Sequence, residues 1–224
     1  MAFQDLLITE IFHSIQGETS LSGLRFAFIR LTGCNLRCTY CDSSYAFKNG
    51  KKMKVVEILE QIRLFRVEHV LITGGEPLLQ RNTADLVHAL RAENYKVSIE
   101  THGEISIADI SPYARIIMDV KTPSSGMDRM GFKKNLPFLK STDEVKFVIA
   151  SQADYAWAKS ILEQFAFNTS ELLFSPAVPA TKSPGTFPSV DARWLAERIL
   201  EDQLPVRLQI QLHKNLWGAD RTGV

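Results

Sequence analysis

The segment GCNLRCTYCD, residues 33–42, contains all three cysteines of the chain, Cys34, Cys38 and Cys41. In a reducing compartment, an odd number of closely spaced thiols indicates metal binding or catalysis rather than a disulfide framework. An iron–sulfur cluster normally takes four cysteine thiolates, so the C-x3-C-x2-C spacing would leave one iron without a protein ligand. Such an open iron is a place where a substrate or a cofactor can bind.

Zinc binding is an alternative interpretation of the same segment. A structural zinc site has four protein ligands, commonly from two pairs of cysteines, and this chain has no second pair. A distant histidine, His13 or His69, would have to complete the shell. A non-catalytic iron–sulfur or zinc-binding module is therefore one hypothesis for this protein. The aromatic ring of Tyr40 would cover a cluster from water or simply pack in the loop.

A second motif, TGGEP at residues 73–77, combines two glycines with a carboxylate. A purely structural interpretation is a turn from a strand to a helix, with Gly74 and Gly75 for backbone freedom and Pro77 in the first helical turn. The functional interpretation is that the glycines let a ligand approach the backbone while Glu76 offers an anion to an amine. Opposite an open iron, this arrangement suits an amino-acid group.

Apolar, β-branched runs alternate with helical patterns along the chain, which predicts an α/β fold. Such an order implies a parallel sheet covered by helices, either as an open doubly wound sheet or as a complete or partial barrel. Two segments containing proline, serine and glycine, 121–131 and 176–188, are predicted to be long surface loops. The expected strands are 24–31, 68–73, 95–100, 115–120, 144–150, 171–176 and 206–212, and the expected helices lie within 54–65, 83–93, 152–165 and 190–201.

Candidate functional residues follow the carboxyl ends of these strands. TGCNLRC, TGGEP, THGE, KTPSS and HKNLWG each come directly after an expected strand. In β/α folds the loops at this rim build active sites, so the shared position supports an enzyme more strongly than any single motif does. His213 and Lys214 of the last motif are expected on the same rim.

Composition sets the remaining limits. The chain has 224 residues, 45% of them hydrophobic, which is enough for one domain spanning 1–224 with a full core. Its 26 basic and 25 acidic residues leave a net charge of +1, which gives no general basic surface for nucleic acid. No apolar run approaches the roughly 18 residues of a membrane span, and the start MAFQDLLITE does not resemble a signal peptide. A cytoplasmic location is therefore expected.

The cysteine spacing, with Tyr40 beside the last cysteine, together with GGE in TGGEP, resembles the radical S-adenosylmethionine (SAM) superfamily. The resemblance implies a modified, incomplete β/α (TIM-like) barrel and a 4Fe–4S cluster held by Cys34, Cys38 and Cys41. It also implies that SAM chelates the open iron, and that its reductive cleavage yields a radical that abstracts hydrogen. A glycyl-radical activase, which shares the cysteine motif, is the alternative enzyme class.

Within that superfamily, EIFHSIQGET at residues 10–19, IETHGE, DVKTPSS and QLHKNLWG resemble the 7-carboxy-7-deazaguanine synthase family across nearly the whole chain. This resemblance implies a lyase of queuosine and 7-deazapurine biosynthesis. The implied reaction converts 6-carboxy-5,6,7,8-tetrahydropterin to 7-carboxy-7-deazaguanine with loss of ammonia. Mg²⁺, a homodimer and a reductant such as flavodoxin are also implied.

Family resemblance assigns roles to individual positions. Gln16 has amide atoms suited to a pterin edge and Arg30 a planar fork suited to a carboxylate, although a turn or an ion pair would also explain them. The family usually has threonine as the magnesium ligand where this chain has Ser43, and serine keeps the hard oxygen. The implied substrate contacts are Ile15, Gln16, Gly17, Arg30 and Thr101. The implied SAM contacts are Tyr40, Cys41, Asp42, Gly74, Gly75, Glu76, Gly103, Asp119, Val120 and Lys121.

Overall fold

The computed structural model describes residues 5–169, 171–181 and 183–224. Its described strands form one sheet in the order β3-β1-β2-β4-β5-β6-β7-β8-β9. Neighbours from β2 to β9 are parallel, whereas β1 pairs antiparallel with both β2 and β3. The strands are β1 (Leu6–Ile15), β2 (Arg25–Leu31), β3 (Lys51–Met53), β4 (His69–Gly74), β5 (Lys96–Thr101), β6 (Arg115–Val120), β7 (Glu144–Ile149), β8 (Glu171–Pro176) and β9 (Arg207–Leu208).

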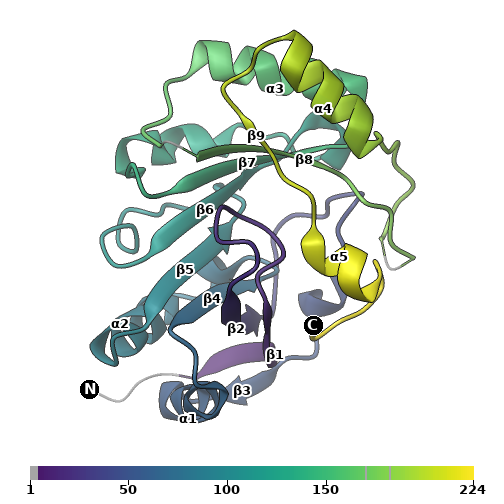
Figure 1. Cartoon of the computed structure of the whole chain (residues 1–224). Helices are drawn as coiled ribbons and strands as arrows, with labels where there is room; N and C mark the ends of the chain where they lie inside the picture. The colour runs from purple at the N-terminus through teal and green to yellow at the C-terminus, as the bar shows by residue number, and fades with distance from the viewer. Residues whose placement is uncertain (1–4, 170, 182) are drawn as a thin grey trace.

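The helices cover the outer side of this sheet. Figure 1 shows α1 and α2 near the β3 end of the curved sheet, α3 and α4 near the β9 end, and α5 on the other side. The pairing order does not close on itself, because β3 and β9 are the two edges in the described part of the chain. The sheet is thus an open barrel. The helices are α1 (Val55–Phe65), α2 (Thr83–Ala92), α3 (Gln152–Gln164), α4 (Ala192–Glu201) and α5 (Leu212–Trp217).

Along each strand, side chains point alternately into the core beneath the helices and toward the inner face of the sheet. Ile29 and Ile72 are fully buried in the large cluster beneath the helices, where they join α1 and α2 residues such as Ile58 and Leu86. Their neighbours in sequence, Phe28 and Leu71, belong to a separate inner cluster. Because successive side chains point to opposite faces of a strand, parallel strands covered on both sides are apolar throughout. This explains the continuous hydrophobic runs in the sequence.

Most predicted elements are confirmed, but the last predicted strand is wrong. The segment 206–212 pairs with β8 only through Arg207–Leu208. After the Gln209 amide donates to the Phe174 carbonyl, the chain leaves the sheet, and the Leu212 amide donates to the Gly17 carbonyl. HKNLWG therefore continues into α5 rather than forming a loop at a strand end. The strands β1 and β3 and the helix α5 were not among the expected elements.

The two predicted surface loops differ from each other. In 121–131, the side chains of Thr122 and Ser125 are fully buried, and a short 3-10 helix spans Pro123–Ser125. The loop is fixed because the Thr39 hydroxyl donates to the Ser124 carbonyl at 2.6 Å. After its buried start, the described part of 176–188 is mostly exposed or half-buried, in line with the prediction. Among the described residues, no helix is long and apolar enough to span a membrane.

Candidate active site

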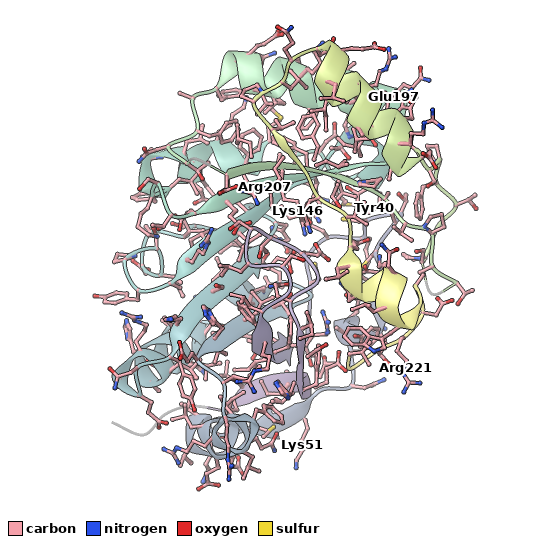
Figure 2. The ribbon with its side chains drawn as sticks, viewed as in Figure 1. Tyr40, Lys51, Lys146, Glu197, Arg207 and Arg221 are labelled. Carbon is pink, nitrogen blue, oxygen red and sulfur yellow. The ribbon has the colours of Figure 1, made fainter. Side chains whose placement is uncertain are left out.

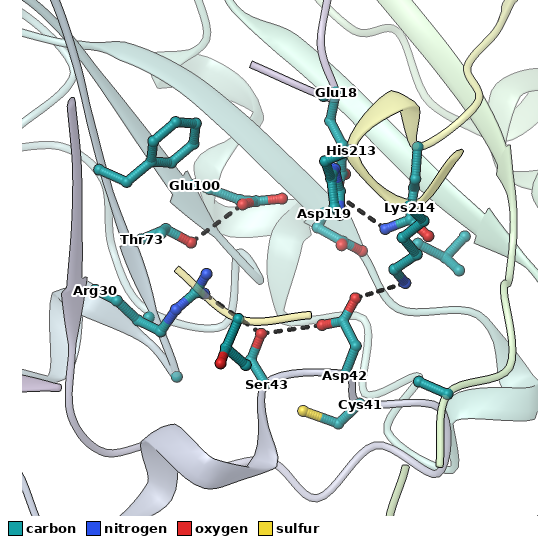
Figure 3. A pocket seen from close by; sticks show the side chains of 18 of the residues that line it. Glu18, Arg30, Cys41, Asp42, Ser43, Thr73, Glu100, Asp119, His213 and Lys214 are labelled. Atoms are coloured by element: carbon teal, nitrogen blue, oxygen red, sulfur yellow. Dashed lines mark hydrogen bonds and ion pairs between the residues drawn. The ribbon is translucent and has the colours of Figure 1, made fainter. Parts of the chain in front are cut away.

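A cavity of about 230 Å³ opens at the carboxyl ends of the parallel strands, bounded on another side by α5 (Figure 3). Side chains from the β1–β2 turn, the cysteine loop and the ends of β4 to β7 line it. The predicted common rim is therefore confirmed for the four motifs that follow strands, whereas HKNLWG reaches the cavity from α5. Of the sequence-predicted residues, Glu76, Gly103 and Val120 do not line the cavity. Those that line it are Ile15, Gln16, Gly17, Arg30, Cys34, Cys38, Tyr40, Cys41, Asp42, Ser43, Gly74, Gly75, Thr101, Asp119, Lys121, His213 and Lys214.

The cysteine loop presents three free thiols to this cavity. Burial raises the pKa of Cys34 and Cys38, and it raises the pKa of Cys41 to about 11. The thiols are therefore protonated until a metal centre displaces their protons. Cys38 packs with Leu36, Tyr40, Ala150 and Ala177, which shield the loop from water. Three thiols in a largely apolar shell fit an iron–sulfur cluster.

The histidines proposed to complete a zinc site lie elsewhere. His13 stacks on Phe65, with 5.6 Å between ring centroids, and His69 stacks on Phe26 at the start of β4. The start of β4 is at the opposite end of the strand from the cysteine loop. The structure therefore gives no support to the zinc hypothesis.

The two glycines of TGGEP bring β4 against the cysteine loop. The Gly75 amide donates to the Leu31 carbonyl, and the Glu76 amide donates to the Gly33 carbonyl at 2.8 Å. A Cβ at Gly75 would overlap the Gly33 carbonyl oxygen and lie 2.8 Å from Cys34 Cβ. Gly74 has φ +144°, in a region that favours glycine. Close packing of the chain on itself thus requires these glycines.

We expect Gly75→Ala to loosen the cysteine loop, because the added methyl group must displace the backbone beside Cys34. Overpacking of this kind costs about 1 to 3 kcal/mol. Iron and sulfide analysis after anaerobic reconstitution should show reduced cluster content, and urea unfolding should show the loss of stability. A variant with wild-type cluster content and stability would contradict this role of Gly75.

The carboxylate of Glu76 does not face a ligand, contrary to the expectation from its motif. It is fully buried and accepts hydrogen bonds from Thr101 Oγ1 and from the amides of Leu78 and His102, all at 2.9 Å. Burial raises its pKa to about 7 despite these hydrogen bonds. The Thr101 hydroxyl is engaged in the same contact. Glu76 therefore joins β4 to the end of β5.

His102 extends this connection to the cysteine loop. Its Nδ1 accepts from the Glu104 amide at 3.0 Å, so Nε2 carries the proton and donates to Asn35 Oδ1 at 2.8 Å. Burial lowers the pKa of His102 to about 3, which keeps the ring neutral. Gly103 adopts φ +78° and lies against Met118 beneath the cavity. His102 thus lines the cavity, whereas Gly103 supports the site without lining it.

A chain of polar contacts runs across the cavity floor (Figure 3). Arg30 Nε pairs with Glu10 Oε1 at 2.7 Å, and its Nη1 donates to Ser43 Oγ at 3.3 Å. Ser43 Oγ donates to Asp42 Oδ1 at 3.0 Å, while Asp42 Oδ2 pairs with Lys214 Nζ at 2.7 Å. Burial alone would raise the pKa of Asp42, but Lys214 holds it well below its usual range. Asp42 is therefore a carboxylate beside a hydroxyl.

The β1–β2 turn meets α5 at the mouth of the cavity. Gln16 Oε1 accepts from the Glu18 amide at 3.0 Å, as a turn residue would, while its buried Nε2 has no partner among the described residues. A Cβ at Gly17 would overlap the His213 ring. Gly17 is thus required for α5 to pack closely, and His213 lines the cavity from that helix.

A charged cluster inside the cavity was not identified from the sequence. Lys146 Nζ lies 2.7 Å from Glu18 Oε2, 2.5 Å from Glu100 Oε1 and 3.3 Å from Asp119 Oδ2. Lys121 Nζ pairs with Asp119 Oδ1 at 3.0 Å. Burial would lower the pKa of Lys146, but the three carboxylates raise it well above the ordinary value. Figure 2 shows Lys146 inside the molecule, whereas Lys51 lies at its outer edge.

Comparison with known proteins agrees with this geometry. Residues 28–136 match the family model described as the Radical SAM superfamily. A curated relative from Koribacter versatilis named 7-carboxy-7-deazaguanine synthase is 44% identical, covering 97% of this chain and 99% of the relative. A relative of the same name from Chlorobaculum tepidum is 40% identical, covering 98% of this chain and 97% of the relative.

Solved structures share the fold. The crystal structure of QueE from Escherichia coli matches with a TM-score of 0.72 at 20% identity, covering 94% of this chain and 97% of that chain. Streptococcus suis SuiB bound to S-adenosylmethionine matches with a TM-score of 0.59 at 15% identity, covering 80% of this chain and 48% of that chain. Together with the family match, these similarities confirm the predicted incomplete β/α barrel.

Proposed function

Because the chain belongs to the 7-carboxy-7-deazaguanine synthase family of radical SAM enzymes, we propose that it converts 6-carboxy-5,6,7,8-tetrahydropterin to 7-carboxy-7-deazaguanine with loss of ammonia. The observation that carries the proposal is that one cavity combines the three-cysteine loop with a carboxylate-binding fork, Arg30, beside Ser43 and Asp42. The cavity is concave and lined by a few convergent polar groups, as small-molecule sites are.

The cofactors of this enzyme class are a 4Fe–4S cluster and SAM. When bound, they supply the one-electron chemistry that removes a hydrogen atom from the substrate. Cys34, Cys38 and Cys41 would hold the cluster. We assign further residues of the cysteine loop and of the ends of β4, β5 and β6 to SAM binding. They are Tyr40, Asp42, Gly74, Gly75, Gly103, Asp119, Val120 and Lys121. Glu76 would support them through Thr101 and His102.

The protein's own residues then orient the substrate. Arg30 places Nε on Glu10 and Nη1 on Ser43, which leaves Nη2 to bind the pterin carboxylate. The amide nitrogen of Gln16, which has no partner among the described residues, would meet the pterin edge, and Ile15, Gly17 and Thr101 line the same cavity. Glu18 and Glu100, held by Lys146, supply acceptors for ring N–H groups. Orienting the substrate in this way lowers the entropic part of the barrier.

Mg²⁺ is proposed at Ser43. Its hydroxyl and the Asp42 carboxylate are hard oxygens 3.0 Å apart beside Arg30. Mg²⁺ usually binds through one or two protein oxygens and takes its other ligands from water and substrate. A substrate carboxylate on Arg30 would lie next to such an ion. Homodimer formation, reduction by flavodoxin and a cytoplasmic location belong to the same proposal, and they rest on the family resemblance and the expected compartment.

The decisive experiment is anaerobic reconstitution with iron and sulfide, followed by incubation with SAM, dithionite, Mg²⁺ and the pterin acid. We expect mass spectrometry to detect 7-carboxy-7-deazaguanine and release of ammonia. Reconstituted enzyme that cleaves SAM but leaves the pterin unchanged would overturn the substrate assignment. The same incubation without pterin controls for uncoupled cleavage.

Replacing Arg30 with lysine should weaken substrate binding. Lysine keeps the charge but cannot serve both Glu10 and a substrate carboxylate, because it lacks the planar fork. Loss of a charged hydrogen bond costs about 1.5 to 3 kcal/mol, so KM for the pterin should rise by about 10- to 150-fold. SAM cleavage without substrate is the internal control and should persist. An unchanged KM would mean that Arg30 serves only its ion pair with Glu10.

Variants at Ser43 test the magnesium assignment. Ser43→Ala should lose stimulation by Mg²⁺, Ser43→Thr should retain it, and Ser43→Cys should respond poorly because Mg²⁺ prefers oxygen to sulfur. Cluster content should be the same in all three variants, because Ser43 is not a cluster ligand. Turnover against Mg²⁺ concentration provides the measurement. Equal stimulation of Ser43→Ala and the parent would leave Ser43 as a structural link between Arg30 and Asp42.

A further inference from the structure

A short segment outside the cavity carries a concentrated positive charge. Residues 48–54, KNGKKMK, hereafter the lysine segment, contain Lys48, Lys51, Lys52 and Lys54 and no acidic residue. All four side chains are exposed, and none forms an ion pair with another described residue. The whole chain is nearly neutral, with 26 basic and 25 acidic residues. The segment is therefore a local excess of charge.

The lysine segment lies beside residues that flank the cysteine loop. Gly50 packs on Thr32, where a Cβ would overlap the threonine side chain, and the Gly33 amide donates to the Ala46 carbonyl at 2.8 Å. The exposed Arg37 bridges the two parts. Its guanidinium carbon lies 4.3 Å from the Phe47 ring centroid, and its Nη1 donates to the Cys34 carbonyl at 2.8 Å.

These contacts connect the first cysteine to the molecular surface. Cys34 is partly exposed, and Arg37 and Lys48 are exposed on either side of Phe47. Lys51 extends outward at the edge of the molecule (Figure 2). Exposed positive charge therefore lies next to the first cysteine at Arg37 and extends through Lys48 toward Lys51, while the cavity lies on the inner side of the loop.

Part of this charge has a structural explanation. β3 is an edge strand, and lysines on an edge strand prevent it from pairing with another chain. That function requires charge of either sign, and it does not require Lys48 or Arg37, which lie outside β3. Protection of the edge therefore accounts for Lys51 and Lys52 but leaves the continuation of the charge toward Cys34 unexplained.

We propose that the lysine segment and Arg37 form the docking surface for an acidic one-electron carrier protein of the flavodoxin class. This inference rests on the proposed function, because the cluster must be reduced before each SAM cleavage. In the transfer, the reduced flavin of the carrier loses one electron and the cluster gains it, with no bond formed or broken. Opposite charges accelerate such an encounter by about 10- to 1,000-fold, and redox partners commonly use small, weak interfaces.

The test compares two charge reversals of equal size in the reconstituted enzyme. Lys48→Glu/Lys51→Glu changes the lysine segment, and Arg25→Glu/Arg66→Glu changes exposed residues near the amino-terminal ends of β2 and β4. Reduced flavodoxin is the probe. Stopped-flow bleaching of the cluster absorbance gives the reduction rate, and calorimetry at low salt gives the Kd of the complex.

We expect the lysine-segment variant to lose at least about tenfold in both the second-order reduction rate and the affinity, and the parent rate to fall as salt rises. The control pair should remain near the parent. Reduction by dithionite should be unchanged in every protein, which separates docking from cluster loss.

Unchanged reduction by flavodoxin in Lys48→Glu/Lys51→Glu would overturn the proposal and leave edge protection as the role of these lysines. An equal loss in both variants would also overturn it, because the effect would then reflect net charge alone. Neither readout requires the pterin. A failure of the proposed substrate would therefore appear separately, as bleaching and SAM cleavage without formation of 7-carboxy-7-deazaguanine.

Discussion

Cys38→Ala should bind no intact 4Fe–4S cluster and should show no reductive cleavage of SAM. Cys38 is the most buried of the three thiols and lies between the other two in the loop, so its loss leaves two cysteine ligands. The family's cluster already lacks a fourth cysteine, and no other thiol exists in the chain to replace Cys38. Iron and sulfide content, visible absorbance and 5′-deoxyadenosine formation are the measurements.

The fold of Cys38→Ala should remain intact, which distinguishes loss of a ligand from unfolding. The side chain packs only in the small cluster with Leu36, Tyr40, Ala150 and Ala177, apart from the main core. Removing one sulfur atom there should cost on the order of 1 kcal/mol. Thr39→Val is a matched control in the same loop, because it removes the bond to Ser124 and no thiol. Full SAM cleavage by Cys38→Ala would refute the assignment of this loop to the cluster.

The sheet could be predicted because parallel strands covered on both faces are short, continuous apolar runs in the sequence. RIIMDV and ELLFSP coincide with β6 and β8 at both ends. The alternating run VRLQIQL was wrongly predicted to be a strand along its whole length. Alternation indicates a strand with one buried face, but it does not show where the partner strand ends. Gln209 makes the final contact with β8, and its side chain then donates to the Gly17 carbonyl at 3.4 Å. Tertiary contacts therefore decide the start of α5.

Motifs placed the site at the correct rim but not every side chain within it. The GGE motif predicted the approach of β4 to the cysteines, yet the direction of the Glu76 carboxylate depends on Thr101 and His102, which follow another strand. Charged residues within largely apolar strands were a signal that was only partly used. Asp119 was assigned to SAM by resemblance, whereas Glu100 and Lys146 were not singled out, although opposite charges in such strands are expected to pair.

Lys146→Met should strongly destabilise the protein. The lysine side chain is only 4% exposed, and removing it leaves Glu18, Glu100 and Asp119 with Lys121 as the remaining close cation. Breaking a buried charge cluster by removing one partner costs about 3 to 5 kcal/mol. Lys159→Met is the matched control, because Lys159 also lies 2.7 Å from a carboxylate, that of Asp202, but is 31% exposed. That exposed pair should contribute less than about 1 kcal/mol.

The directions of the pKa shifts predict how the free energy of unfolding of Lys146→Met changes with pH. In the parent, the folded pKa of Lys146 is raised, so its contribution is complete below the ordinary lysine pKa of about 10.4 and is lost only as pH rises through the folded value. In Lys146→Met, Glu18 and Asp119 lose a cation that lowers their folded pKa values, and burial, which acts in the opposite direction, raises those values. Carboxyl groups with raised folded pKa values lose stability as pH increases from about 4 upward. The deficit of the variant should therefore be larger at pH 8 than at pH 5.

Urea unfolding of the parent, Lys146→Met and Lys159→Met at the two pH values measures these differences. The double variant Lys146→Met/Glu100→Gln removes one of the uncompensated charges, so it should recover part of the loss at pH 8 and give a coupling energy of about 0.5 to 3 kcal/mol. If Lys146→Met lowers the free energy of unfolding at pH 8 no more than Lys159→Met does, the charged cluster does not need Lys146. The expected result would instead establish Lys146 as the residue that allows three carboxylates to lie together in the cavity.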